Sequence, residues 1–241
     1  MGEETFAWTD GRLTHAPVTG DLLVADSWLV DHGRVRGFPL HRDRFTNACA
    51  AEVALKPGDV EDFMNACRAL IPSDGLWFPR VECTGRLWLR LRTAPPIRST
   101  AVVWVGPDPD PRQRTAVKGP DLDVLTALRC QAESLNADEA LLRTPTGLVV
   151  EGALSAIVWW RGDTLCVPGV PTFDSVTRRL VERLAPSVAA ERARIQDLSG
   201  LEVWSLSALH GIRHVNGWIG ADVMAGPAVR LAAWRARLAA S

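Results

Sequence analysis

A short proline-rich run near the middle of the chain places the strongest local constraint on its fold. Residues 106–111 read Gly-Pro-Asp-Pro-Asp-Pro, and proline can neither continue a helix nor donate a hydrogen bond within a central strand. Strand and helix patterns are interspersed on both sides of this run, which predicts an α+β or mixed α/β architecture. We therefore expect a small N-terminal α/β domain over residues 1–105, a linker over residues 106–117 and a larger C-terminal α/β domain over residues 118–241. A surface loop is the alternative reading of the run.

The composition of the 241 residues argues against several classes of protein. Hydrophobic residues make up 47% and charged residues 23%, which is ordinary for a globular protein with a buried core. The net charge of -1 gives no electrostatic reason to expect binding to nucleic acid or to an anionic membrane. No apolar run is long enough for a transmembrane helix, and the first residues are polar and acidic, unlike a secretory signal. Five scattered cysteines are expected to be reduced thiols of a cytoplasmic protein.

The spacing of apolar residues predicts the order of the elements. In the first half we expect helices over residues 40–54 and 57–70 and strands over 6–8, 22–25, 27–30, 34–38, 75–82, 86–93 and 100–105. Asp31-His32-Gly33 is a turn signal that predicts a hairpin. In the second half we expect helices over residues 122–135, 176–184 and 227–240, a meander of strands over 140–143, 147–151, 155–160 and 164–167, and further strands over 202–206 and 212–215.

Three features of the sequence carry functional groups. Lys118, one of only two lysines, precedes a Gly-Pro-Asp turn, where partial desolvation would lower its pKa and make the amine a usable nucleophile or base. Glu151 follows an apolar strand, where a carboxylate is costly to bury without a partner. Ser175-Val176-Thr177 begins a helix whose N–H groups and Thr177 hydroxyl could bind a phosphate. Taken singly, each has a simpler interpretation: a solvated lysine, a strand-end glutamate and an ordinary helix cap.

A fourth feature is Arg44, which lies one helical turn after His41. Its guanidinium could make a bidentate phosphate contact, and a surface salt bridge is the alternative. The chain order of lysine, carboxylate and helix start suits pyridoxal phosphate. In such a site the lysine holds the aldehyde, the carboxylate pairs with the ring nitrogen and the helix start holds the phosphate.

Together these motifs resemble the class IV aminotransferase family, the fold-type IV enzymes that use pyridoxal phosphate. His41-Arg42-Asp43-Arg44 resembles the H-x-x-R helix start of the family, and Gly147–Gly152 resembles its glycine-to-glutamate strand. Pro168–Arg178 resembles the phosphate element, with Ser175 where glycine is usual. The segment from Ser207 to Ile212 resembles the late phosphate-side loop. The resemblance extends over roughly residues 20–216 and includes the 33-residue spacing from Lys118 to Glu151.

The resemblance implies roles for particular residues. Lys118 would bind the cofactor covalently and shuttle protons, and Glu151 would pair with the pyridine nitrogen. The residues implied to hold the phosphate are Arg44, Val176, Thr177 and either Ser207 or Ala208. A homodimer is also implied, because the active sites of the family lie near the subunit interface. No metal is expected, because His210 and His214 have helical spacing but lie in a predicted loop and strand.

Departures from the family pattern bear on the reaction. Ala25-Asp26-Ser27 stands where aminotransferases usually carry Phe-Glu, and Ser27 falls near the position where aminodeoxychorismate lyases can place a threonine hydroxyl beside the lysine. The Ser207–Ile212 segment also resembles the lyase branch. The resemblance therefore implies a lyase that releases pyruvate and gives 4-aminobenzoate, with Lys118 and Ser27 as catalytic residues. An aminotransferase acting on a small amino acid and a 2-oxo acid is the alternative, and a non-catalytic protein that binds the cofactor is the third.

Overall fold

The computed structural model describes residues 3–240, and the chain divides into two units. Unit 1 comprises Met1–Ile97 and Val117–Pro120, and unit 2 comprises Arg98–Ala116 and Asp121–Ser241. These boundaries differ from the expected domains. Strand β9 (Thr100–Trp104) pairs with β10 and β16 of unit 2, so the stretch before the proline-rich run joins that unit. Most of the expected linker belongs to unit 2 as well, whereas Lys118 returns to unit 1.

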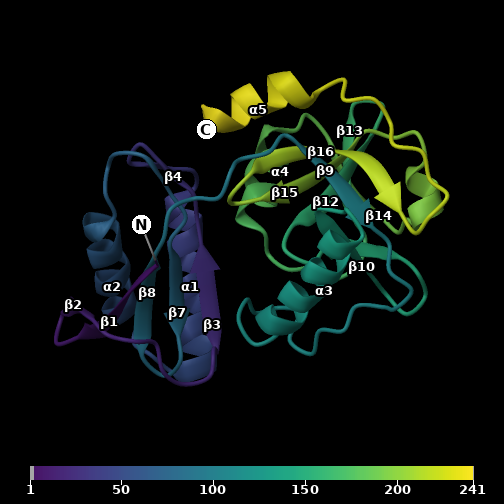
Figure 1. The fold of residues 1–241 in the computed structure, drawn as a ribbon. Helices are drawn as coiled ribbons and strands as arrows, with labels where there is room; N and C mark the ends of the chain where they lie inside the picture. The colour runs from purple at the N-terminus through teal and green to yellow at the C-terminus, as the bar shows by residue number, and fades with distance from the viewer. Residues whose placement is uncertain (1–2, 241) are drawn as a thin grey trace. The chain divides into compact units, whose positions relative to one another are not determined.

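Unit 1 is an antiparallel sheet with two helices on one face (Figure 1). Its five strands lie in the order β2-β1-β8-β7-β3. They are β1 (Glu4–Thr9), β2 (Arg12–His15), β3 (Val24–Ser27), β7 (Arg80–Cys83) and β8 (Leu87–Leu91). A second small sheet contains β4 (Val30–Asp31), β5 (Arg34–Val35) and β6 (Leu76–Trp77). The helices are α1 (Phe38–Val53) and α2 (Pro57–Leu70).

The predicted hairpin and the predicted second helix are both confirmed. His32 and Gly33 join β4 to β5 with φ angles of 47° and 76°, the left-handed conformations that a two-residue hairpin turn needs. Helix α2 begins at Pro57, because proline fits the first turn, where its missing N–H is not needed. Helix α1 begins two residues before the predicted start, and Phe38 takes part in its first turn.

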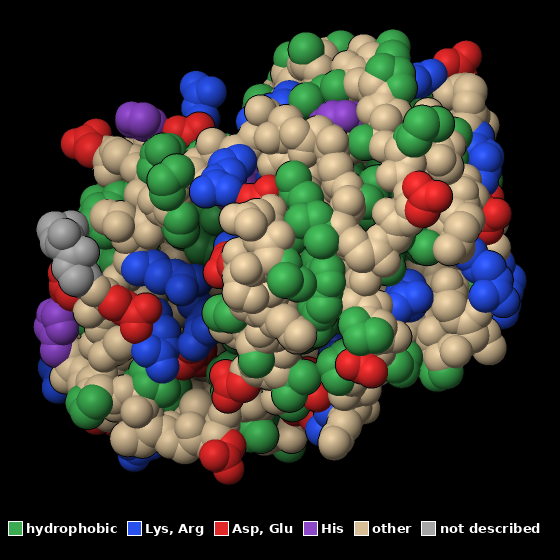
Figure 2. All heavy atoms as spheres, turned by 45° about the vertical axis from the view of Figure 1, so that its right-hand side comes forward, with side chains coloured by type: hydrophobic (Ala, Val, Ile, Leu, Met, Phe, Trp, Pro, Cys, Tyr) green, Lys and Arg blue, Asp and Glu red, His purple; other side chains and the backbone are tan. Residues whose placement is uncertain are grey.

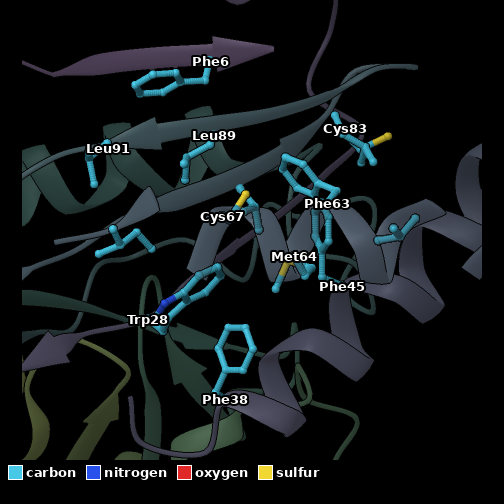
Figure 3. Packing of buried hydrophobic residues seen from close by; sticks show 14 of the residues in the cluster. Phe6, Trp28, Phe38, Phe45, Phe63, Met64, Cys67, Cys83, Leu89 and Leu91 are labelled. Atoms are coloured by element: carbon cyan, nitrogen blue, oxygen red, sulfur yellow. The ribbon is translucent and has the colours of Figure 1, made fainter. Parts of the chain in front are cut away.

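The core of unit 1 lies between the sheet and the two helices. Phe45 of α1 packs with Phe63 and Met64 of α2, and Leu89 of β8 faces them from the sheet (Figure 3). Val24 of β3 belongs to the same cluster. Because side chains alternate along a strand, Asp26 points to the same face as Val24. The Asp26 carboxylate therefore faces helix α1.

Unit 2 is built on an eight-stranded mixed sheet in the order β11-β10-β9-β16-β15-β12-β13-β14. Besides β9, its strands are β10 (Glu139–Arg143), β11 (Val149–Gly152), β12 (Ala156–Arg161), β13 (Thr164–Pro168), β14 (Val188–Glu191), β15 (Val203–Ser207) and β16 (Gly211–Ile219). Its helices are α3 (Leu122–Ser134), α4 (Val176–Leu184), α5 (Leu231–Ala239) and the short 3-10 helix η1 (Ile195–Leu198). The mixed α/β architecture expected from the sequence is confirmed.

The predicted meander of four consecutive strands is wrong. Strands β10 and β11 form one hairpin and β12 and β13 form another, but β9, β16 and β15 separate the two hairpins in the sheet. Strand β12 pairs with β15 rather than with β11. Periodicity identifies a strand but does not identify its partner, which here lies more than forty residues away in the chain.

The distribution of surface charge and the character of the helices are relevant to binding of nucleic acid or a membrane. Basic and acidic side chains are interspersed over the face drawn in Figure 2. This agrees with a composition that has 27 lysine and arginine residues against 28 aspartate and glutamate residues. Among residues 3–240, none of the helices combines the length and apolar character that crossing a membrane requires.

Candidate functional site

Lys118 lies in a short segment of unit 1, Val117–Pro120, that runs beside the edge strand β3. The N–H of Ala25 donates a hydrogen bond of 2.6 Å to the carbonyl of Lys118. The next residue, Gly119, has a φ of 154°, and a Cβ there would come within 2.7 Å of the Leu23 carbonyl. Only glycine permits so close an approach. The chain therefore returns from unit 2 to place Lys118 beside the strand that carries Asp26.

The surroundings of Lys118 favour its neutral amine. Burial lowers the pKa of Lys118 to about 8. The negative charge of Asp26 opposes this shift, and positive charges, first that of Arg44, add to it. Within the described part of the chain, the amine makes no hydrogen bond or ion pair. A lysine in this state has a larger neutral fraction near neutral pH than a solvated lysine, and the neutral amine can act as a nucleophile or base.

Asp26 is a completely buried carboxylate that holds two side chains of α1. Nδ1 of His41 lies 2.8 Å from Oδ1, and Arg44 donates from Nε to Oδ2 and from Nη2 to Oδ1, each at 2.8 Å. Burial alone would raise the pKa of Asp26, but Arg44 and His41 hold it well below its ordinary value. Burial in turn lowers the pKa of His41, although Asp26 opposes this shift. The Asp26 carboxylate is therefore ionised and orients the Arg44 guanidinium.

The H-x-x-R spacing explains this geometry, although the sequence pattern did not identify Asp26 as the partner. Residues three apart lie on the same side of a helix, so His41 and Arg44 face β3 together. The Arg44 side chain is only 12% exposed, so the salt bridge that was the alternative for this residue is present but is buried against Asp26 rather than at the surface. Its predicted role toward a phosphate remains a proposal.

Ser27 follows Asp26 at the end of β3 and lies opposite Arg80 of β7. Because successive side chains alternate, the Ser27 side chain lies on the face of β3 opposite to that of Asp26. The residue is buried, and its hydroxyl makes no hydrogen bond within the described residues, to Lys118 or to any other group. Ser27 is thus two residues from the backbone contact that holds Lys118.

Glu151 is a buried carboxylate of unit 2 with two donors. The N–H of Phe173 donates to Oε1 at 2.9 Å, and Nη1 of Arg112 lies 2.9 Å from the same oxygen. Burial raises the pKa of Glu151, and Arg112 opposes this shift. Arg112 also forms a bidentate pair with Asp110, from Nε to Oδ1 at 2.9 Å and from Nη2 to Oδ2 at 2.6 Å. A segment expected to be only a linker therefore supplies the partner of Glu151.

Replacing Arg112 by methionine should lower the free energy of unfolding by roughly 2–4 kcal/mol, because the change leaves a buried carboxylate without its cation. Urea unfolding of the cofactor-free protein measures this loss. The matched control is Arg42→Met, which removes an exposed pair with Asp43 and should cost less than about 1 kcal/mol. Equal losses in the two variants would contradict the role assigned to Arg112.

The start of helix α4 has the features of an anion site. Ser175 caps the helix, and its hydroxyl accepts a hydrogen bond of 3.3 Å from the N–H of Arg178. Val176 and Thr177 are buried, and within the described chain their N–H groups donate to no acceptor. Two unpaired N–H groups at the positive end of a helix dipole suit a phosphate.

The turn between β15 and β16 supplies Ser207 and Ala208. The Ser207 hydroxyl accepts a hydrogen bond of 3.2 Å from the N–H of His210. Gly211 closes the turn with a φ of 68° and pairs with Ser207 across the hairpin. Helix α4 packs on β15, because Val181 and Leu206 share one apolar cluster. The two predicted phosphate elements of unit 2 thus rest on a common core.

Titratable groups elsewhere do not form a metal centre in the described residues. No group of three or more His, Cys, Asp or Glu side chains within residues 3–240 is arranged to hold a metal ion. His214 lies buried within β16, and His210 lies in the preceding turn, where its Nδ1 accepts from the N–H of Arg98 at 3.3 Å.

Comparisons with known proteins identify the family and the fold. A family model described as Amino-transferase class IV matches residues 23–218. No curated protein sequence matches the chain. A hypothetical aminotransferase from Mycobacterium tuberculosis in its PLP-bound form has a TM-score of 0.81 at 16% identity, covering 99% of this chain and 98% of that chain.

Two further solved structures show the same fold. An aminotransferase from Brucella abortus bound to the cofactor PLP has a TM-score of 0.77 at 18% identity and covers 99% of this chain and 100% of that chain. A provisionally assigned 4-amino-4-deoxychorismate lyase has a TM-score of 0.73 at 19% identity, with 88% of each chain covered. At these identities the likeness shows the fold.

Proposed function

The chain belongs to the class IV amino-transferase family, and on that premise we propose that it is a pyridoxal-phosphate enzyme that releases pyruvate from aminodeoxychorismate and forms 4-aminobenzoate. The observation that carries the cofactor assignment is the environment of Lys118. The Lys118 backbone is held against β3 by a hydrogen bond from Ala25, and the side-chain amine has a pKa of about 8 and makes no hydrogen bond within the described residues. Family membership makes a homodimer the expected assembly.

The chemistry of the candidate residues suits each of the three polar groups of the cofactor. Lys118 would bind the aldehyde carbon. Glu151, a buried carboxylate, would pair with the protonated ring nitrogen. The N–H groups of Val176 and Thr177, together with Ser207 or Ala208 and Arg44, would hold the phosphate. When bound, the cofactor supplies an electron sink for the substrate carbon.

The side chains around these groups have supporting roles. Arg112 opposes the rise in the pKa of Glu151 and so favours the carboxylate that the ring nitrogen needs. Asp26 orients Arg44 through two hydrogen bonds and favours the protonated form of Lys118 through its charge. In the proposed reaction the Lys118 amine would take the proton from the ring carbon that bears the amino group and, as general acid, deliver a proton to the departing enolpyruvyl group, which leaves as pyruvate.

Ser27 is the residue that supports the lyase over other reactions of the family. Its hydroxyl has no partner within the described chain, and it lies at the end of β3, the strand against which Lys118 is held. In the proposed reaction this hydroxyl would donate or accept a proton. The Ser207–Ile212 turn, which resembles the lyase branch, supports the same assignment.

An aminotransferase is the second candidate. The structures from Mycobacterium tuberculosis and Brucella abortus, which have higher TM-scores than the provisional lyase, are both described as aminotransferases. Both reactions require the same lysine and the same carboxylate, so the groups around the cofactor do not distinguish them.

A pyruvate assay without any amino donor distinguishes the two reactions. We expect the cofactor-loaded protein to release pyruvate from aminodeoxychorismate, and Ser27→Ala to lower the rate by about 10- to 100-fold, while Ser27→Thr retains most of it because the hydroxyl is kept. Amino-group transfer from an amino acid to the cofactor, with no pyruvate from aminodeoxychorismate, would instead support the aminotransferase.

A further inference from the structure

Helix α5 is firmly anchored to unit 2, although it lies beyond residue 218, where the family match ends. Trp234 is buried, with its ring centroid 5.1 Å from that of Trp160 and 5.5 Å from that of Trp204. Just before the helix, the N–H of Arg230 donates to Oε1 of Glu202 at 3.0 Å. An aromatic cluster and a buried carboxylate therefore fix the position of α5.

One arginine of α5 binds the turn that carries Ser207 and Ala208. Nη1 of Arg235 donates to the carbonyl of His210 at 3.2 Å and also to the carbonyl of Ile212. These two carbonyls lie on either side of Gly211, where the turn enters β16. Hydrogen bonds from a charged donor are stronger than neutral ones. Arg235 therefore holds the peptide planes at the end of the turn.

The planarity of the peptide bond connects these carbonyls to Gly211, which pairs with Ser207 across the hairpin. The carbonyl of His210 shares a rigid plane with the N–H of Gly211. A fixed carbonyl thus fixes the neighbouring N–H. The turn is held internally by only one side-chain hydrogen bond, from the N–H of His210 to the Ser207 hydroxyl, among the described residues. From outside the turn, the N–H of Arg98 donates to Nδ1 of His210, and Arg235 of α5 holds the two backbone carbonyls.

A second arginine of α5 contacts helix α4 at the end opposite to the predicted phosphate contact. Nη2 of Arg237 donates to the carbonyl of Leu184, the last residue of α4, at 2.8 Å. Arg237 and Arg235 thus lie on one helix, but only Arg235 bonds the turn. This difference provides a matched control within the same element.

We propose that Arg235 is a positioning residue for the cofactor phosphate, acting through the β15–β16 turn. The inference rests on the proposed function, in which this turn contributes to the phosphate site. A preordered turn loses less conformational entropy when an anion binds, so the affinity for the phosphate is higher. The effect should be confined to the phosphate, because Arg235 bonds neither Lys118 nor Glu151 within the described chain.

The test compares pyridoxal phosphate with pyridoxal, which lacks the phosphate. Both are titrated into the cofactor-free protein, and tryptophan fluorescence and the visible absorbance report binding. The ratio of the two affinities measures the contribution of the phosphate. For Arg235→Met we expect the affinity for pyridoxal phosphate to fall roughly tenfold, equivalent to about 1.4 kcal/mol. The affinity for pyridoxal should stay within about twofold.

The control variants separate positioning from general destabilisation. Arg235→Lys keeps a charged donor and should restore most of the ratio, whereas Arg237→Met should leave the ratio unchanged. An unchanged ratio in Arg235→Met and Arg235→Gln would overturn the inference while leaving the proposed function intact. Failure of the unmodified protein to bind pyridoxal phosphate at all would overturn both.

Discussion

Replacing Lys118 by alanine should abolish the visible absorbance of the cofactor-loaded protein and lower its turnover by more than about 10³-fold. The change removes both the amine that binds the cofactor and the group that moves the proton. Absorbance spectra before and after dialysis, together with the pyruvate assay, measure the two losses. The hydrogen bond that holds Lys118 to Ala25 uses the backbone carbonyl, which alanine retains, so the variant should remain folded.

The chain provides its own control, because Lys56 is the only other lysine. Lys56 is exposed at the start of α2, and Lys56→Ala should retain both the absorbance and the turnover. A Lys118→Ala variant that keeps the visible band would contradict the assignment of Lys118.

The pH dependence of the amine follows from its surroundings. Burial lowers the pKa of Lys118 from 10.5 to about 8, so its reaction with an amine-specific reagent should reach half of its maximal rate near pH 8. Peptide mass spectrometry of the cofactor-free protein measures this rate, with Lys56 as the internal reference. A midpoint near that of an ordinary lysine would show that the amine is solvated.

Replacing Asp26 by asparagine should lower the free energy of unfolding by roughly 3–5 kcal/mol, because it leaves the Arg44 guanidinium largely buried without its carboxylate. Removal of the negative charge should also move the pKa of Lys118 further below about 8, since Asp26 is the group that opposes the shift. Urea unfolding of the cofactor-free protein and the labelling of Lys118 measure the two effects.

Asp43→Asn is the matched control, because Asp43 lies on the same helix and pairs with Arg42 at the surface. It should cost less than about 1 kcal/mol. A loss for Asp26→Asn as small as that of Asp43→Asn would contradict the anchoring role of Asp26.

The dependence of the free energy of unfolding on acidic pH also tests the role of Asp26. Its pKa is lower in the folded protein than in the unfolded chain, so the stability that it contributes is complete above the unfolded value. That contribution is lost as the pH falls below about 4 toward the folded pKa. The unmodified protein should therefore lose more stability below this pH than Asp26→Asn does.

Local signals in the sequence predicted many of the elements and the chain order of the site. The limits of α2 and α4 agree with the prediction, because a proline and a serine mark their first turns. The two left-handed residues at His32 and Gly33 follow from the turn signal. The order of the motifs, together with the spacing of Lys118 and Glu151, identified the family that the comparison confirms.

Other features depend on partners that are distant in the chain. The sequence pattern around Asp26 indicates only a strand residue. Its partner Arg44 lies 18 residues later in the chain and reaches Asp26 only when α1 packs on β3. Arg112 directly follows the proline-rich run, in the segment predicted to be a linker, and only the folded chain pairs it with Glu151. Strand β14 has the sequence Val-Ala-Ala-Glu and is mostly exposed, so it lacks the alternation that identifies a strand.

Reduction of the cofactor-loaded protein with borohydride, followed by peptide mass spectrometry, tests the central claim most directly. Borohydride makes the bond between lysine and cofactor permanent, and the two lysines fall in different peptides. We expect the mass of the cofactor on the peptide containing Lys118 and not on the peptide containing Lys56. The mass on the Lys56 peptide, or on neither peptide, would contradict the role of Lys118.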